Sequence, residues 1–403
     1  MSLIMIDPVY YSLDFSETAL WLLIAMAVIT IANALIMWRK LIRVTRKVNS
    51  DDEAALPDSG YPAASVIIYS RADGENLTTL LPQILNQDYP APFEVIVVND
   101  KIDDYTEGVI SELELQYSNL YMTFTPDNTR NLSRRKLSLT LGIKAARYNA
   151  IIHTQGNCRV NSPLWLRSMM RHFIDGKSVV IGYATNMGPN DTEDCDKNKR
   201  RRAFDDVWQS VRYLSAAIKN KAHRGDACNL AYSRDLFFAV KGYSNTLNLT
   251  YGDDDLFVNE ISTADNTATE LSHNGRVDIA HYSPAIHHAT ERARRDFTAG
   301  MLPREPFIIM ALSSWLWWVG AAAGIAAAVT GLPSLIPAVT AFAIACIFTI
   351  IYIKLWRKCS IALGYRKLRF TIPILAMLRP LRTAIHQLTG RRWHNAHFTN
   401  TIH

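Results

Sequence analysis

Three almost purely apolar runs, at residues 19–37, 307–330 and 332–353, limit what this 403-residue chain can fold into. Each run is close to the roughly 20 residues that a helix needs to cross a bilayer. We therefore predict one transmembrane helix near the N-terminus, two near the C-terminus, and a soluble domain between them. The remaining segments are an external N-terminus, a basic linker and a basic tail, at residues 1–18, 38–62 and 354–403.

Basic residues flank the apolar runs on one side only. No Lys or Arg precedes the first run, whereas Arg39, Lys40 and Arg43 follow it closely. Residues 354–403 carry ten Lys and Arg and no Asp or Glu. The positive-inside rule places both flanks in the cytoplasm. This predicts an integral protein of the plasma (inner) membrane, with its N-terminus outside and its soluble domain in the cytoplasm.

The net charge of +6 would suit a nucleic-acid partner, but the excess is confined to those flanks. Between residues 48 and 353 the acidic residues outnumber the basic ones. Residues 361–387 mix large apolar side chains with spaced Arg and Lys, which is typical of a helix among anionic lipid headgroups. A basic tail solvated in the cytosol is the alternative. We predict membrane lipids as a partner, and no nucleic acid.

Strand and helix patterns alternate through the soluble part. Apolar strands are predicted at residues 64–69, 93–98, 120–125, 150–154 and 178–184, with amphipathic helices between them. Strands that alternate with helices of this length form a mostly parallel sheet covered on both faces. We therefore predict a doubly wound α/β domain over residues 63–300, with its ligand site at the carboxyl ends of the strands.

Four blocks of this domain follow in a characteristic order. They read SVIIYSRADGENLTTLLPQILNQDYPAPFEVIVVND, RRKLSLTLGIKAARYNAIIHTQGNCRVNSPLWLRSM, CNLAYSRDLFFAVKGYS and GDDDLFVNEI. Together they resemble membrane-anchored family 2 glycosyltransferases over roughly residues 63–300. The resemblance implies a GT-A fold, typical of nucleotide-diphospho-sugar transferases, and an enzyme that transfers a sugar from such a donor to an acceptor.

The resemblance implies nucleotide-sugar contacts at the strand ends. Asp100 ends a buried strand, where the family uses an Asp to accept a hydrogen bond from the nucleobase. An Asp that caps the turn before the next helix is the alternative. Arg71, Arg135 and Lys136 are further expected contacts, because basic side chains and a helix start suit a diphosphate. A solvated basic face is the alternative for the pair at the helix start.

Asp253, Asp254 and Asp255 precede a short apolar run and so lie at the first turn of a predicted helix. Helix capping accounts for one or two of them without any chemistry. In the resembling family this block supplies the general base that removes a proton from the acceptor hydroxyl. Crowding by like charges raises the pKa of a carboxyl, which suits that task. We predict Asp254 as the base, with Asp253 and Asp255 as the next candidates.

One motif departs from the family's pattern. Relatives carry Asp-x-Asp after the fourth strand to hold Mg²⁺ or Mn²⁺ on the diphosphate, whereas this chain has Gln155 and Asn157. Amide oxygens ligate a divalent ion but bring no charge, so we expect weak metal binding and regard either ion as a doubtful cofactor. Asp226 is a candidate replacement ligand and a candidate acceptor contact.

A second departure lies near residues 291–297, where polymer-forming relatives often have a Gln-x-x-Arg-Trp-like motif. This chain reads ERARRDF there. Arg292 and Arg295 remain candidates for contact with phosphate or acceptor.

These departures leave three hypotheses open. The first is an active inverting glycosyltransferase that modifies a lipid-linked or cell-surface glycan at the cytoplasmic membrane face, in polysaccharide or cell-envelope biosynthesis. The second is a catalytically inactive relative that binds a sugar nucleotide or a partner synthase and acts as a regulatory or scaffolding subunit of a polysaccharide-synthesis complex. The third is a synthase coupled to export, which is disfavoured because three spans seldom enclose a channel.

Overall fold

The chain forms two compact units in the computed structural model, which describes residues 16–101, 103–126, 132–185, 199–280, 284–365 and 371–390. The first unit holds the apolar helices, and the second holds the α/β domain. Most of the predicted external N-terminus and the end of the predicted basic tail lie outside the described residues.

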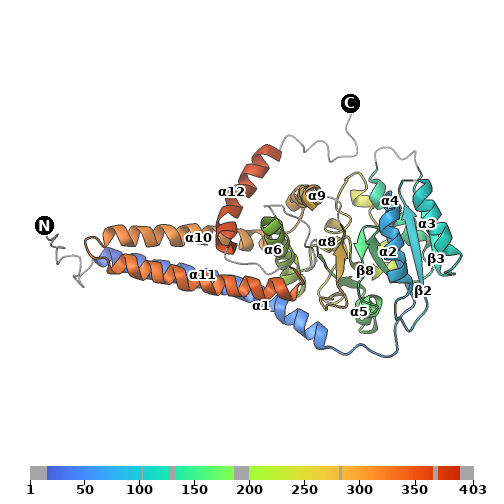
Figure 1. Ribbon diagram of the computed structural model, residues 1–403, viewed down its shortest axis with the longest axis horizontal. Coiled ribbons are helices and arrows are strands. Elements are labelled where there is room, and N and C mark those ends of the chain that lie inside the picture. Colours follow the sequence, from blue (N-terminus) through green and yellow to red (C-terminus); the bar gives the residue numbers. More distant parts are fainter. Residues whose placement is uncertain are drawn as a thin grey trace, which may run out of the picture. The chain divides into compact units, whose positions relative to one another are not determined.

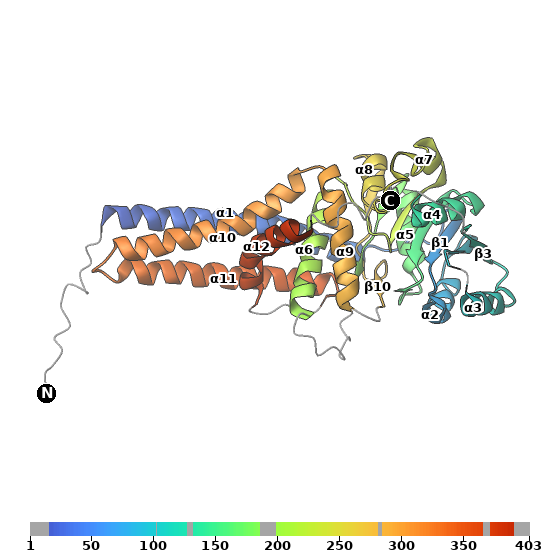
Figure 2. The same ribbon diagram turned by 90° about the horizontal axis from the view of Figure 1, so that it is seen from above.

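Three helices are long and apolar enough to cross a membrane, namely α1 (Glu17–Glu53), α10 (Glu305–Thr330) and α11 (Ile336–Ala362). The first unit holds α10, α1 as far as Ile42 and α11 as far as Ser360. This confirms the prediction of one N-terminal and two C-terminal apolar helices. The three run side by side in both views (Figures 1 and 2). A fourth helix of this unit, α12 (Ile372–Gly390), lies within the predicted amphipathic tail.

Small and polar residues join α1 to α10 within that unit. A Cβ at Gly324 would lie 2.9 Å from the sulfur of Met26, so glycine lets the two helices approach closely. Ser313 donates a hydrogen bond to Asn33 over 2.5 Å. The first helix also continues to Glu53, so the predicted basic linker begins as helix.

A seven-stranded sheet with the order β3-β2-β1-β4-β8-β6-β9 organises the second unit. Its strands are β1 (Ala64–Ser70), β2 (Phe93–Asn99), β3 (Leu120–Phe124), β4 (Ala150–Gln155), β6 (Val179–Ile181), β8 (Leu230–Ser233) and β9 (Thr267–Thr269). Only β8 runs antiparallel to its neighbours, β4 and β6. The mostly parallel sheet confirms the predicted fold class.

Helices and a small second sheet complete the second unit. The helices are α2 (Gly74–Leu85), α3 (Asp104–Glu114), α4 (Arg134–Ala145), α5 (Trp165–Ile174), α6 (Lys199–Ala217), α7 (Arg234–Ala239), α8 (Leu256–Ile261) and α9 (Pro284–Thr298). The small sheet has the order β5-β10-β7, from Cys158–Arg159, Val277–Ile279 and Ala184–Thr185.

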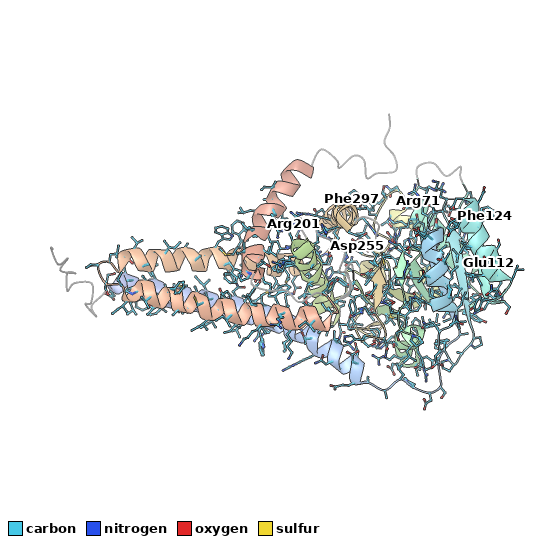
Figure 3. All side chains as sticks on the ribbon, viewed as in Figure 1. Arg71, Glu112, Phe124, Arg201, Asp255 and Phe297 are labelled. Atoms are coloured by element: carbon cyan, nitrogen blue, oxygen red, sulfur yellow. The ribbon has the colours of Figure 1, made fainter. Side chains whose placement is uncertain are left out.

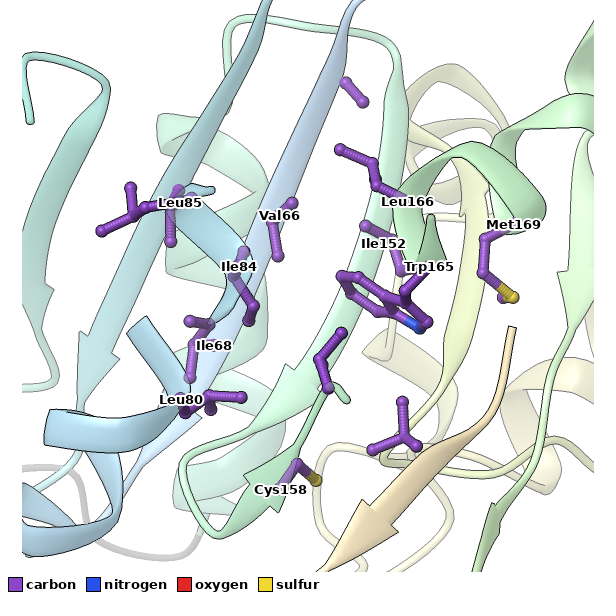
Figure 4. Close-up of a cluster of buried hydrophobic side chains, with 14 of the residues drawn as sticks. Val66, Ile68, Leu80, Ile84, Leu85, Ile152, Cys158, Trp165, Leu166 and Met169 are labelled. Atoms are coloured by element: carbon purple, nitrogen blue, oxygen red, sulfur yellow. The ribbon is translucent and has the colours of Figure 1, made fainter. Parts of the chain in front are cut away.

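Side chains of β1 alternate between two layers, as the period of a strand requires. Val66 and Ile68 belong to the cluster that includes Leu80 of α2 and Trp165 of α5 (Figure 4). Ile67 faces the other layer, where a Cβ on Gly142 of α4 would come within 2.7 Å of it. Burial of each such side chain contributes about 1.5–3 kcal/mol. These two layers hold the strand ends, and therefore the site, in fixed positions.

The predicted strand at residues 178–184 is two short strands, β6 and β7. The chain breaks at Gly182, whose N–H donates to the carbonyl of Asn229 and whose added Cβ would lie 2.5 Å from that side chain. The close approach leaves no room for a side chain there, and the strand pattern in the sequence does not reveal it.

Candidate active site

Asp100 lies directly after β2 and is buried. Its carboxylate accepts hydrogen bonds from the Tyr69 hydroxyl at 2.8 Å and from Arg134 Nε at 2.9 Å, while Arg71 Nε lies 3.8 Å away. The residue that caps α3 is Asp103, which accepts from the Thr106 N–H. Asp100 is thus free of the capping role that was its alternative, but both of its oxygens already have protein partners. Its contact with a nucleobase stays a prediction.

Arg135 extends from the first turn of α4 across the strand ends. Its Nε donates to Asp253 Oδ2 at 2.7 Å, and its guanidinium carbon lies 5.1 Å from the centre of the Tyr69 ring. The side chain is 17% exposed. This places a cation, reachable by solvent, beside the end of β1.

Lys136 corrects one expectation. It is completely buried, and its Nζ donates to the carbonyls of Thr246, Leu249 and Tyr251 at 2.6, 3.2 and 2.8 Å. An ammonium group has three donors, and all three are used. Lys136 therefore holds the loop that leads to the aspartate block and is not available to a diphosphate.

The three aspartates of the block have three different environments. Burial acts to raise the pKa of Asp253, but Arg135 and Arg294 outweigh it and hold that pKa well below the usual carboxyl range. Asp255 caps α8, since it accepts from the Leu256 N–H at 2.7 Å, and it also accepts from the Thr298 hydroxyl. Both residues are committed to ion pairs or capping.

Asp254 differs from its two neighbours. Burial, opposed by Arg294, raises its pKa to about 7. Arg294 Nη2 lies 3.5 Å from one carboxylate oxygen and Arg224 Nη2 lies 3.7 Å from the other. A carboxyl of this pKa takes and releases a proton near neutral pH, which is what a general base must do.

Asp254 lines a small cavity of the second unit, with room for a few water molecules. Gln155, Asp226 and Arg295 line the same cavity. Burial raises the pKa of Asp226, and its carboxylate accepts from the N–H groups of Ala184 and Cys228 at 3.1 and 3.0 Å. The structure therefore brings the predicted base, the degenerate motif and one predicted acceptor contact to one cavity.

The residues at the end of β4 fit a divalent cation poorly. Gln155 donates its amide to the thiol of Cys228 at 3.0 Å, and Asn157 does not line the cavity. Both side chains are neutral. Within the described ranges, no group of three His, Cys, Asp or Glu side chains is placed to hold a metal ion.

Helix α9 supplies residues that sequence reasoning missed. Arg294 and Glu291 line the cavity, and they pair through Nη1 and Oε1 at 2.8 Å. Arg295 lines it too, whereas Arg292 is not among its lining residues and pairs instead with Asp296 at 3.7 Å. Figure 3 labels Phe297 on α9 and Asp255 directly before α8.

The sequence spacing of these α9 residues places them on one face of the helix. Glu291, Arg294, Arg295 and Thr298 follow the i, i+3, i+4, i+7 pattern of one helix face. A search for polar rather than apolar helical periodicity would have found them. Arg224, Tyr213 and Tyr365 also line the cavity, and no comparable signal in the sequence marks them.

Comparisons with known proteins agree with this architecture. The pattern described as glycosyl transferase family 2 matches residues 65–237, and no curated protein sequence matches the chain. Among solved structures, the chain is similar to mannosyltransferase PcManGT from Pyrobaculum calidifontis, in complex with GDP-Man and Mn²⁺, at 17% identity over 88% of this chain and 99% of that chain, with a TM-score of 0.50. A structure of S. aureus TarS 1-349 matches at 16% identity over 83% and 89% of the two chains, with a TM-score of 0.39. At this level of identity, the first of these two similarities supports the fold alone.

Proposed function

We propose that this protein is an active inverting glycosyltransferase with Asp254 as its general base. The match of residues 65–237 to the glycosyl transferase family 2 pattern supports the proposal. The observation that carries this proposal is the buried carboxyl of Asp254, which lines the cavity with a pKa of about 7. Its neighbours Asp253 and Asp255 are occupied by an ion pair and a helix cap.

The proposed reaction is a single displacement. The acceptor hydroxyl oxygen bonds to the anomeric carbon as the bond from that carbon to the donor's diphosphate oxygen breaks. The electron pair leaves with the nucleoside diphosphate, and the hydroxyl proton passes to Asp254. Arg224 and Arg294 orient the carboxylate from two sides. Asp226 and Arg295 line the same cavity and are the proposed acceptor contacts.

We further propose that the acceptor is a lipid-linked or cell-surface glycan at the cytoplasmic face of the plasma (inner) membrane. One helix that could span a membrane precedes the catalytic domain in the sequence, and two follow it. Basic residues follow the first apolar run and the last one, which supports a cytoplasmic catalytic domain. This placement suits polysaccharide or cell-envelope biosynthesis, with other synthesis proteins as partners.

A turnover assay tests the proposal. The full-length protein in lipid nanodiscs is incubated with a panel of nucleotide-diphospho-sugars, and release of nucleoside diphosphate is followed with and without Mn²⁺. We expect turnover by the wild type and its loss in Asp254→Asn. Asp88→Asn is the matched control, because Asp88 pairs at the surface with Arg167. Equal turnover by wild type and Asp254→Asn would refute the assignment of the base.

The second candidate function is an inactive binding or scaffolding subunit. Neutral Gln155 and Asn157, where relatives carry a metal-binding Asp-x-Asp, favour it. The same assay separates the two functions when nucleotide binding is measured in parallel by calorimetry. Binding without turnover, for every donor and in either metal condition, would favour the scaffold.

A further inference from the structure

We infer that the guanidinium group of Arg135 takes the place of a divalent cation on the donor's diphosphate in this chain. The inference rests on the proposed function, because it assumes a nucleotide-diphospho-sugar donor. It concerns how the charge of that donor is neutralised, and it follows from the mismatch between the end of β4 and a metal ion.

The end of β4 lacks charged ligands for a divalent cation bound to a diphosphate. Gln155 is neutral, and its amide donates to the Cys228 thiol at 3.0 Å. Asn157 is neutral as well, and its backbone carbonyl accepts from the Ala280 N–H at 2.8 Å. Hard divalent cations prefer charged carboxylate oxygens. Another positive charge must therefore meet the diphosphate at this point of the sheet.

Arg135 reaches this point from the neighbouring strand. Tyr69 of β1 is the register partner of Gln155 of β4, and adjacent strands lie about 4.8 Å apart. The guanidinium of Arg135 stacks on the Tyr69 ring at 5.1 Å. The cation is thus one strand away from the degenerate motif, on the side where the strands end.

One edge of this guanidinium is fixed and the other is open. Asp253 holds Nε at 2.7 Å. The two Nη groups have no hydrogen-bond partner within the part of the chain that the structure describes, and the side chain is 17% exposed. A guanidinium with a free Nη edge matches the geometry of two phosphate oxygens. By holding Nε, Asp253 orients Arg135 so that its two Nη groups remain available to a ligand.

Neighbouring arginines are already engaged. Arg294 gives Nη1 to Glu291 and Nη2 to Asp253 and Asp254. Arg134 gives Nε to the Asp100 carboxylate and Nη2 to the Asp100 carbonyl. Of these three arginines, Arg135 alone keeps a free fork beside the strand ends.

The charge balance of the step is simple. When the bond from the anomeric carbon to the diphosphate oxygen breaks, the electron pair stays on that oxygen. A guanidinium remains protonated at all working pH values, so it stabilises this charge without a proton transfer and without a metal.

Calorimetry on the full-length protein tests the inference, with UDP, GDP, CDP and dTDP as probes in either EDTA or Mn²⁺. We expect the preferred probe to bind wild type with the same Kd, within about twofold, in both buffers. Arg135→Gln should weaken binding by about tenfold or more, the loss of one bidentate charged contact. Arg135→Lys keeps the charge without the fork and should fall between the two.

Arg147→Gln is the matched control. Arg147 follows α4 and is largely exposed. It pairs with Glu94 near the start of β2, at the opposite end of the strands from Arg135. It should leave the Kd unchanged. Thermal unfolding of each variant shows whether it is folded, and the EDTA comparison on wild type needs no variant at all.

Two outcomes separate this inference from the proposed function. Binding that EDTA abolishes and Mn²⁺ restores in the wild type would overturn the inference and leave the glycosyltransferase assignment intact. Absence of binding for all four probes in both buffers would overturn the proposed function, and the inference with it.

Discussion

The end of β4 and the loop before α8 both contribute lining residues to one cavity, but they differ in charge. The first carries neutral Gln155, tied to a thiol. The second carries three consecutive aspartates, each with its own partners. The loop holds three buried carboxylates, whereas the strand end is neutral and has Arg135 near it, over the Tyr69 ring. Under the proposed function, proton removal would depend on one particular carboxyl, whereas an arginine could neutralise the diphosphate in place of a metal ion.

The largest expected effect separates the two regions by turnover. Asp254→Ala should lower the transfer rate by about 10²–10⁴-fold, the usual contribution of a general base. Gln155→Ala should lower it by less than about tenfold, because a neutral amide bonded to a thiol contributes no charge. Steady-state release of nucleoside diphosphate measures both. Equal losses in the two variants would contradict the contrast.

Within the aspartate loop, Asp253→Asn should act on stability. It removes the carboxylate that pairs with Arg135 at 2.7 Å and with Arg294 at 3.2 Å. Breaking a buried ion pair on one side costs about 3–5 kcal/mol. Urea unfolding followed by tryptophan fluorescence measures the loss, with exposed Asp88→Asn as the reference. A loss below about 1 kcal/mol would mean that Asp253 is not the anchor of the two arginines.

Lys136→Met sharpens the comparison between neighbours on α4. The variant leaves the carbonyls of Thr246, Leu249 and Tyr251 without their donor. Buried acceptors left unpaired cost about 1–3 kcal/mol each, partly recovered by rearrangement, so we expect a loss of about 2–4 kcal/mol. Nucleotide affinity of the folded fraction should stay within about twofold, the reverse of the pattern expected for Arg135→Gln. Weakened nucleotide binding at full stability would restore Lys136 as a phosphate contact.

The smallest expected effect is on pH dependence. Asp254 must be deprotonated to act, and its pKa is about 7. The transfer rate should therefore rise with pH, about tenfold from pH 5 to 6, and level off above 7. Arg294 lowers this pKa, so Arg294→Gln should move the inflection to higher pH. A rate profile that is flat between pH 5 and 8 would exclude Asp254 as the group that titrates.

The sequence predicts this fold well because its signals are local. Apolar strands and amphipathic helices between residues 64 and 155 have boundaries close to those observed, since each segment carries its own period. Antiparallel β8, inserted between β4 and β6, depends on pairing between distant segments, which no local pattern records.

The roles of individual basic residues were less predictable. Arg134, Arg135 and Lys136 are consecutive on a helix, so their side chains point about 100° apart. One pairs with Asp100, one extends over Tyr69, and one is completely buried. Sequence shows that the triplet is basic, but only packing decides which member faces which neighbour. The roles of Asp100, Arg71 and Arg295 stay predictions for the same reason.

The inserted strand β8 also sets an order of assembly. Strands β1 to β4 are complete once residue 155 has been synthesised. Among the described strands, they pair with one another and, later, with β8. In the part of the chain that the structure describes, the partners of β6 are β8 and β9, which follow it in the sequence. Half of the sheet can therefore form on the ribosome while β6 waits for partners that emerge later. We expect β1 to β4 to pair first, and β6 and β9 to join the sheet only after β8 has paired with β4.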